Sequence, residues 1–124
     1  MRVALIDYGA GNLASVCKAL EAVAAQVYVP ALPGELQGAD AIVIPGVGHF
    51  GATASLDAHW RAILLSLVEA GRPLLGICLG MQFLFEGSDE APLSAGLGLL
   101  PGHCTCLVPG DGNSVGPSSR ATLK

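Results

Sequence analysis

One of the four cysteines, Cys78, lies in a sequence that favours nucleophilic chemistry. It is the centre of Gly76-Ile77-Cys78-Leu79-Gly80, in which a glycine stands two residues before the nucleophile and another two residues after it. This pattern is typical of a tight turn between a strand and a helix, because the turn leaves no room for side chains at the glycine positions. The turn would expose the sulfur, the N-terminus of the following helix would lower the pKa of the thiol, and the N–H of Leu79 would donate to an oxyanion. A buried structural cysteine between two packing glycines is the alternative interpretation.

The segment Pro45-Gly46-Val47-Gly48 is a second feature that could take part in this chemistry. Its two glycines allow the backbone to turn its N–H groups toward a neighbouring loop. In an open α/β sheet such a loop can lie beside the turn at Cys78, where it would complete an oxyanion hole. A plain glycine-rich turn is the alternative interpretation, and the tetrapeptide taken alone favours it.

Two further patterns do not support a cofactor site or a metal site. Residues 7–12 contain only two of the three glycines of a dinucleotide fingerprint, so a nicotinamide site is rejected. His103, Cys104 and Cys106 do not have the spacing of the usual zinc ligands, and no second ligand pair follows them. We therefore expect that the chain uses no cofactor and no metal.

The elements that must position these residues alternate between strands and helices. Short apolar runs predict buried strands at 3–7, 26–29, 41–44 and 73–77. Helical spacing of apolar residues predicts helices at about 13–24, 52–70 and 79–86. This alternation predicts an α/β fold, an open parallel sheet with helices on both faces. Since sites on such sheets lie at the carboxyl ends of the strands, the segments 8–12 and 45–48 and Cys78 should meet there.

The composition limits the class of protein. The chain has 124 residues, 52% hydrophobic and 13% charged, which suffices for one compact domain with a core. Its net charge of −4 offers no basic surface, so we expect no nucleic-acid partner. No apolar run reaches the roughly 20 residues that span a bilayer, and the N-terminus lacks the features of a signal peptide. We expect no membrane association, a cytoplasmic location and reduced cysteines.

The character of the sequence changes near residue 102. Residues 109–120 are rich in Gly, Pro, Ser, Asp and Asn and show no periodicity. Such a segment cannot bury an apolar face. We therefore predict one domain at 1–102, incomplete at its C-terminus, and an atypical, disordered tail at 103–124.

Four motifs in residues 1–102 together resemble one family, the glutaminase subunit of imidazole glycerol phosphate synthase, within the triad-type (class I) glutamine amidotransferases. The motifs are Asp7-Tyr8-Gly9-x-Gly11-Asn12-Leu13-x-Ser15-Val16, Pro45-Gly46-Val47-Gly48-His49-Phe50, Leu75-Gly76-Ile77-Cys78-Leu79-Gly80-Met81-Gln82-x-Leu84-Phe85-Glu86 and Gly96-Leu97-Gly98-Leu99-Leu100. The cysteine turn is shared by many amidotransferases, whereas the first two motifs are specific to the histidine-biosynthesis subunit.

The resemblance implies a reaction and a set of site residues. Cys78 would attack the side-chain amide of glutamine and form a glutamyl thioester, releasing ammonia. The oxyanion hole would consist of Gly46, Val47, Gly48 and Leu79, and two further residues would bind the glutamine, namely Gln82 and Glu90. The ammonia would pass to a partner cyclase subunit, a (β/α)₈ barrel, in a heterodimer that makes imidazole glycerol phosphate. The family needs no metal or organic cofactor.

The sequence departs from this family in one respect. The family activates its cysteine with a His and a Glu on a His-x-Glu segment, which does not occur in the chain. A thiolate without that histidine lacks a general base and a proton donor for the departing ammonia, so we expect little activity from the chain as given. Our hypothesis is a truncated or frame-shifted product.

Two alternatives remain at this point. One is a non-catalytic fragment that binds the cyclase through a face around residues 8–12 and Phe50. The other is a glutaminase that supplies a different synthase.

Overall fold

The computed structural model describes residues 1–107 and 121–122 and contains a four-stranded, fully parallel sheet at its centre. The strand order is β2-β1-β3-β4, in which β1 pairs with both β2 and β3. In chain order the elements are β1 (Arg2–Leu5), α1 (Leu13–Ala22), β2 (Gln26–Tyr28), the 3₁₀ helix η1 (Pro33–Gly38), β3 (Ala41–Ile44), the 3₁₀ helix η2 (Phe50–Ser55), α2 (Ala58–Glu69), β4 (Leu74–Gly76) and α3 (Leu79–Gln82).

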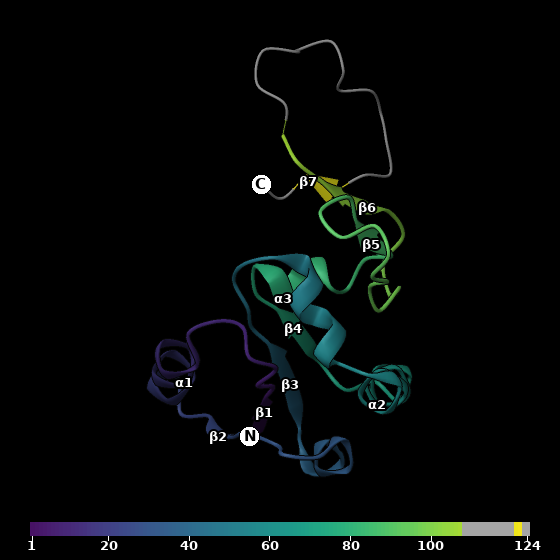
Figure 1. The fold of residues 1–124 in the computed structure, drawn as a ribbon. Helices are drawn as coiled ribbons and strands as arrows, with labels where there is room; N and C mark the ends of the chain where they lie inside the picture. Colours follow the sequence, from purple (N-terminus) through teal and green to yellow (C-terminus); the bar gives the residue numbers. More distant parts are fainter. Residues whose placement is uncertain (108–120, 123–124) are drawn as a thin grey trace.

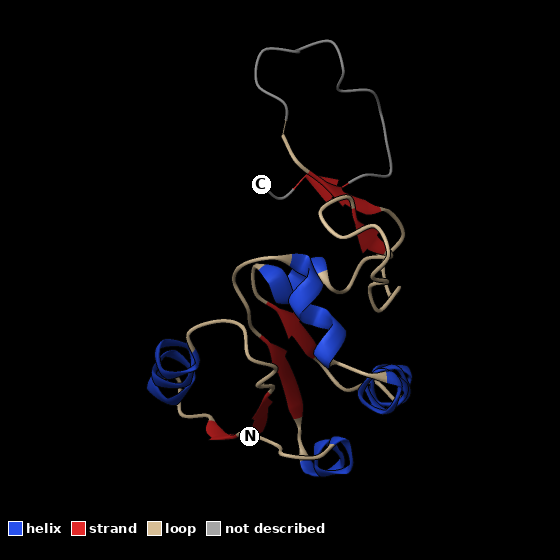
Figure 2. Cartoon of the chain, viewed as in Figure 1, coloured by secondary structure: helices blue, strands red, loops and turns tan. Residues whose placement is uncertain are grey.

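Helices cover both faces of this sheet, as predicted (Figures 1 and 2). Alternate residues of the strands point to opposite faces, and both sets are apolar. Ile42 and Ile44 belong to the layer that packs against α2 and η1. Val3 and Val43 belong to the layer that packs against α1. The two layers explain why the strands could be recognised as continuous apolar runs.

The helix predicted at 52–70 is two elements, so that prediction was wrong over residues 52–57. Asp57 interrupts the helical pattern because its carboxylate accepts the N–H groups of His59 at 3.0 Å and Trp60 at 3.2 Å. These bonds place Asp57 at the N-cap of α2, where a side-chain oxygen satisfies N–H groups that have no partner inside the helix. The preceding residues therefore form the separate 3₁₀ helix η2.

The helix predicted at 79–86 ends early, at Gln82. The carbonyls of Phe83, Leu84 and Phe85 accept N–H groups from residues 97–100 instead of from the next helical turn. The contacts run from Leu97 to Phe83 at 2.6 Å, from Gly98 to Phe85 at 3.0 Å and from Leu100 to Leu84 at 3.0 Å. A returning loop therefore replaces the last turn of the predicted helix.

A second, small parallel sheet follows, with the order β5-β6-β7. It consists of β5 (Gly87–Ser88), β6 (His103–Thr105) and β7 (Ala121–Thr122), none of which was predicted. In Figure 1 it lies beyond α3, on the side where the central strands end. Strand β6 falls within the predicted tail at 103–124, and residues 109–120, for which we predicted disorder, lie outside the described residues. The domain boundary at residue 102 stays a prediction.

Within residues 1–107 and 121–122, none of the helices combines the length and the apolar character needed to cross a bilayer.

Candidate active site around Cys78

Cys78 occupies the sharp turn between β4 and α3 that the glycine spacing predicts. Its backbone has φ 54° and ψ −114°, a left-handed conformation that non-glycine residues rarely adopt. Its side chain is exposed, which contradicts the alternative of a buried structural cysteine. Backbone strain of this kind costs about 1–3 kcal/mol and is concentrated at functional sites. The fold thus holds the sulfur outward at the carboxyl end of a parallel strand.

Both flanking glycines are required by close backbone contacts. A Cβ atom on Gly76 would lie 2.6 Å from the Cα of Met81, inside α3. A Cβ atom on Gly80 would overlap the carbonyl oxygen of Ile44 at the end of β3. Side chains at these two positions would push α3 away from the sheet, and the turn at Cys78 would open.

The loop 45–48 lies directly beside this turn. The carbonyl of Gly46 accepts the N–H of Leu79 at 3.0 Å, and a Cβ atom on Gly46 would lie 3.1 Å from that of Leu79. Gly46 and Gly48 both have positive φ, 147° and 110°, which glycine adopts without strain. The sequence therefore predicted the right neighbour for the turn. In this conformation, however, the Leu79 N–H is bonded within the protein.

A residue that sequence reasoning did not assign to the site also reaches this loop. Tyr8 follows β1, is 7% exposed, and donates its hydroxyl hydrogen to the carbonyl of Pro45 at 2.5 Å. Burial, and to a lesser extent the negative charge of a Cys78 thiolate, raise the pKa of Tyr8 to about 12. The effect of Cys78 on Tyr8 places the two groups in one electrostatic environment. The sequence placed the segment 8–12 at this edge of the sheet and Tyr8 in the first family motif, but it gave no specific role to the hydroxyl of Tyr8.

The two residues predicted to bind glutamine meet at one cavity. Gln82 is 2% exposed, and its N–H bonds to the carbonyl of Cys78 at 3.1 Å, one helical turn away. Glu90 is exposed, and its carboxylate accepts the N–H of Phe50 at 2.7 Å. Both line a cavity of about 230 Å³, whose other lining residues are Ser88, Asp89, Cys104, Thr105 and Cys106. Cys78 does not line this cavity, although α3 joins it directly to Gln82.

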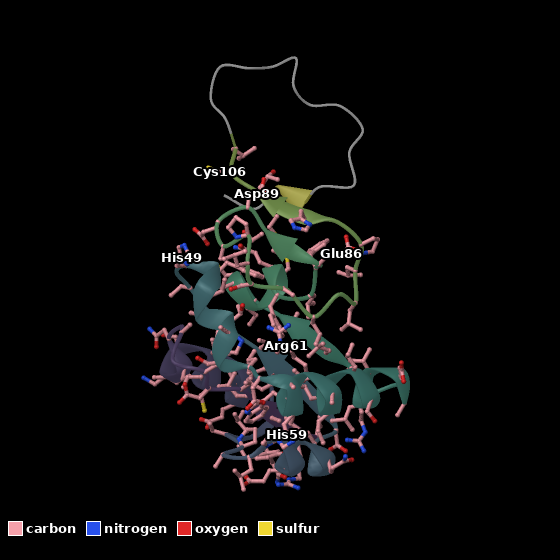
Figure 3. The ribbon with its side chains drawn as sticks, turned by 45° about the vertical axis from the view of Figure 1, so that its right-hand side comes forward. His49, His59, Arg61, Glu86, Asp89 and Cys106 are labelled. Carbon is pink, nitrogen blue, oxygen red and sulfur yellow. The ribbon has the colours of Figure 1, made fainter. Side chains whose placement is uncertain are left out.

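The histidines lie in separate places. His49 accepts the N–H of Gly51 with its Nδ1 at 3.0 Å, which caps η2. His59 lies on α2 beside η1 and is at the opposite end of the view from Asp89 and Cys106 in Figure 3. His103 is exposed at the start of β6. Within the described part of the chain, no group of three His, Cys, Asp or Glu side chains is placed to hold a metal ion.

The proposed docking face around residues 8–12 and Phe50 needs a correction. Phe50 is fully buried and Tyr8 is nearly so, because both belong to the apolar layer that packs against α2. Neither aromatic ring is available to a partner in this conformation. Only Gly9, Gly11 and Asn12 are exposed in the first segment.

Comparison with known proteins identifies relatives of this arrangement. The family model described as "Glutamine amidotransferase class-I" matches residues 4–91. The chain is 48% identical over 106 residues to "Imidazole glycerol phosphate synthase subunit HisH" of Pyrococcus furiosus, covering 86% of this chain and 52% of that protein. A subunit of the same name from Thermus thermophilus is 49% identical over 105 residues, with 83% and 53% covered. The Bacillus subtilis subunit is 48% identical over 107 residues, with 85% and 50% covered.

The chain thus spans about half the length of the curated relatives it matches. Among solved structures, one titled "Crystal structure of glutamine amidotransferase" matches with a TM-score of 0.70 at 20% identity. It covers 82% of this chain and 54% of the other. A putative peptidase E from Listeria monocytogenes matches with a TM-score of 0.61 at 19% identity, over 68% of this chain and 50% of the other. These two likenesses support the α/β fold.

Proposed function

This chain belongs to the class-I glutamine amidotransferase family, and from this we propose that Cys78 is the nucleophile of a glutamine-hydrolysing reaction that supplies ammonia for imidazole glycerol phosphate synthesis. One observation carries the proposal. The strained, exposed Cys78 stands at the end of a parallel strand, with a glycine loop in contact with the residue that follows it. Proteins that break a peptide-like bond through a nucleophile need these parts together, an accessible nucleophile and N–H groups for the developing oxyanion.

The chemistry proceeds in two steps. The Cys78 thiolate attacks the side-chain carbonyl carbon of glutamine, and the carbon–oxygen double bond becomes an oxyanion. When this intermediate collapses, the carbon–nitrogen bond breaks and the nitrogen leaves as ammonia after gaining a proton. Water then cleaves the thioester, which releases glutamate and restores the thiol. His49, His59 and His103 lie apart from one another, and we assign the proton transfers to none of them.

The oxyanion hole would be formed by Leu79 together with Gly46, Val47 and Gly48. The Leu79 N–H is bonded to the Gly46 carbonyl in the structure, so this bond must break before the N–H can bind an oxyanion. The positive φ of the two glycines and the 59% exposure of Val47 allow the loop to turn without displacing the core. Substrate binding would then be linked to rotation of this loop.

Glutamine itself would enter the cavity shared by Gln82 and Glu90. The carboxylate of Glu90 has the charge that an α-ammonium group requires, and the amide of Gln82 can donate to the α-carboxylate of the substrate. The backbone of α3 links this cavity to Cys78.

The name of the relatives implies a second subunit, and the resemblance suggests that the partner is a cyclase with a (β/α)₈ barrel. We propose that the chain acts with this cyclase, in a heterodimer in the cytoplasm, where the biosynthesis would take place.

A covalent probe tests the proposal without depending on ammonia release. The probe is a glutamine analogue whose amide nitrogen is replaced by a chloromethyl group, giving a chloroketone. The sulfur of Cys78 would attack the chloromethyl carbon and expel chloride, so no proton has to be transferred to a leaving group. We expect saturable labelling of Cys78, located by peptide mass spectrometry, with glutamine as a competitor. The experiment is done with and without the cyclase.

Two variants sharpen the result. Cys78→Ala should abolish the labelling, whereas Cys17→Ala, which removes a half-buried thiol on α1, should leave it unchanged. Labelling that does not saturate, that glutamine does not slow, or that falls equally on the other cysteines would contradict the proposed function. Cyclase binding without labelling of Cys78 would contradict it as well.

A further inference from the structure

Tyr8 is bonded to the loop 45–48 at a single, defined point. Its hydroxyl donates to the Pro45 carbonyl at 2.5 Å across 37 residues of sequence, and the bond is buried. The carbonyl belongs to the peptide group that joins Pro45 to Gly46. The bond therefore fixes the orientation of the peptide group immediately before the first glycine of the loop.

The packing around Gly46 shows how closely this peptide is held. A Cβ atom on Gly46 would overlap the hydroxyl oxygen of Tyr8, and one on Gly11 would lie 2.9 Å from the Cα of Gly46. Leu79 approaches from α3. The first glycine of the loop is thus held between the segment that follows β1 and the helix that follows Cys78.

The middle of the loop is open to solvent on its side-chain side. Val47 is 59% exposed, and a Cβ atom on Gly48 would meet nothing within 4 Å. Beyond Gly48 the chain is held through His49, which accepts the N–H groups of Gly51 and Ala52, and through Phe50, whose N–H bonds to Glu90. Because a glycine backbone imposes little conformation of its own, the position of residues 46–48 depends on how firmly the two ends are held.

We propose that Tyr8 is a positioning residue for the reaction at Cys78, in which its hydroxyl fixes the Pro45–Gly46 peptide so that the glycine loop meets the oxyanion of the substrate. This inference rests on the proposed function of Cys78. Tyr8 itself touches no reacting atom. It acts through the loop, and misplacement of an oxyanion donor by a fraction of an ångström lowers the rate of the chemical step more than it weakens substrate binding.

Tyr8→Phe is the informative variant because it removes only the hydroxyl and keeps the ring in the core. Tyr28→Phe is its matched control. Tyr28 also donates its hydroxyl to a backbone carbonyl, that of Glu35 at 2.6 Å, but it lies on β2 beside η1. Circular dichroism first establishes that both variants of the full chain are folded at the assay temperature.

Two reagents then separate a positioning role from a structural one. The chloroketone analogue of glutamine depends on the oxyanion site, because donors to its carbonyl oxygen polarise the ketone and align the neighbouring chloromethyl carbon with the sulfur. Iodoacetamide alkylates the same sulfur without needing that site. In Tyr8→Phe we expect the limiting rate of chloroketone labelling at Cys78 to fall about tenfold. The concentration for half-maximal rate and the iodoacetamide rate at Cys78 should stay unchanged, and Tyr28→Phe should match the unaltered protein.

The possible outcomes are distinct. If the unaltered chain is not labelled by the chloroketone, the proposed function itself fails. If it is labelled and Tyr8→Phe is labelled at the same limiting rate, the function stands and the positioning role of Tyr8 is wrong. If both reagents slow equally in Tyr8→Phe, the hydroxyl affects the access or reactivity of the sulfur, and the inference is overturned in favour of a structural role.

Discussion

The four-stranded sheet and the segment 83–107 are stabilised by different kinds of contact. In the sheet, the contacts are two apolar layers of side chains, one against α2 and one against α1. The segment 83–107 adds Phe83 and Leu97 to the first layer, but its course is set by isolated backbone hydrogen bonds between loops. One example is the bond of the Gly96 N–H to the Glu86 carbonyl at 2.8 Å, and another is the bond of the Glu86 N–H to the Gly102 carbonyl at 3.0 Å.

The candidate site lies where these two regions meet. Cys78 is carried by β4 and the loop 45–48 follows β3, so the proposed chemistry belongs to the region with the apolar layers. Glu90 belongs to the segment 83–107, and so do five other residues that line the cavity. The difference suggests a division of roles. In the proposed function the sheet would hold the reacting atoms in place, and we expect the segment 83–107, which lines the proposed substrate cavity, to open at a lower free energy.

The largest expected effect comes from two glycines, one in each region, where an added Cβ atom would overlap a backbone carbonyl oxygen. A Cβ atom on Gly80 would overlap the carbonyl of Ile44, and one on Gly96 would overlap the carbonyl of Phe85. We expect Gly80→Ala to lower the free energy of unfolding by about 3 kcal/mol, because α3 must leave the sheet. We expect Gly96→Ala to leave global unfolding nearly unchanged and to reduce amide protection only in residues 83–102.

Urea unfolding followed by the fluorescence of Trp60, the one tryptophan, measures the first effect, and hydrogen exchange measures the second. Gly34→Ala is the control, because a Cβ atom at that position meets nothing within 4 Å. Equal losses of global stability in Gly80→Ala and Gly96→Ala would show that the two regions unfold as one unit, and the comparison would fail.

The next effect concerns binding in the segment 83–107. Glu90→Gln removes the negative charge that, in our proposal, binds the α-ammonium group of the substrate glutamine. The amide oxygen of the new side chain can still accept the Phe50 N–H. The concentration of chloroketone for half-maximal labelling should rise about tenfold, equivalent to about 1.4 kcal/mol, with the limiting rate unchanged. Glu86→Gln is the control in the same segment, since Glu86 bonds to Gly102 and does not line the cavity. A fall in the limiting rate instead would place Glu90 in the chemical step.

The contrast between the regions also explains which parts of the fold could be predicted. Residues of the central strands are apolar on both faces because both faces are covered, so a local run of apolar residues was sufficient evidence. Strands β5 and β6 contain only two and three residues, and their pairing depends on partners far along the chain. No local pattern marks such strands, and they were missed.

The boundary errors have a similar cause. Apolar spacing alone joined η2 to α2, although Asp57 followed by Ala58 and His59 has the character of a helix start and could have been recognised. The early end of α3 could not, because residues 97–100 provide the N–H groups that replace its last turn.

The features of the candidate site likewise divide into those that local sequence predicts and those that it does not. The turn at Cys78 was predictable because both required glycines lie within two residues of it. The position of the loop 45–48 beside the turn could be predicted from the parallel fold. The roles of Tyr8 and of the Gly46 carbonyl were not predictable, since they depend on single hydrogen bonds between residues more than 30 positions apart.

A smaller effect tests whether a change beside the four-stranded sheet alters binding at the cavity. Asp57→Ala removes the cap of α2 and should lower the free energy of unfolding by about 1 kcal/mol. Asp57→Asn, which keeps a side-chain acceptor, should lose much less. Because α2 does not line the cavity, half-maximal labelling by the chloroketone should occur at the same concentration in all three proteins. A change in that concentration would show that the cavity depends on the position of α2.

The last expected effect, which is absent at neutral pH, is a pH dependence of stability that arises from Tyr8. The pKa of Tyr8 is about 12 in the folded chain, against a reference of 10.0, so the folded state holds the phenolic proton more tightly than the unfolded state does. The resulting contribution to stability is fully present below pH 10 and is lost as the pH rises toward 12. The midpoint of unfolding should therefore fall more steeply in this window in the unaltered chain than in Tyr8→Phe.

In Tyr28→Phe, Tyr8 is the only tyrosine, and ultraviolet absorbance follows its ionisation directly. Adding Cys78→Ser to that variant removes the thiolate and should lower the pKa of Tyr8, because a neighbouring negative charge no longer opposes ionisation. An unchanged titration would mean that Tyr8 does not sense Cys78, and burial alone would then account for its raised pKa.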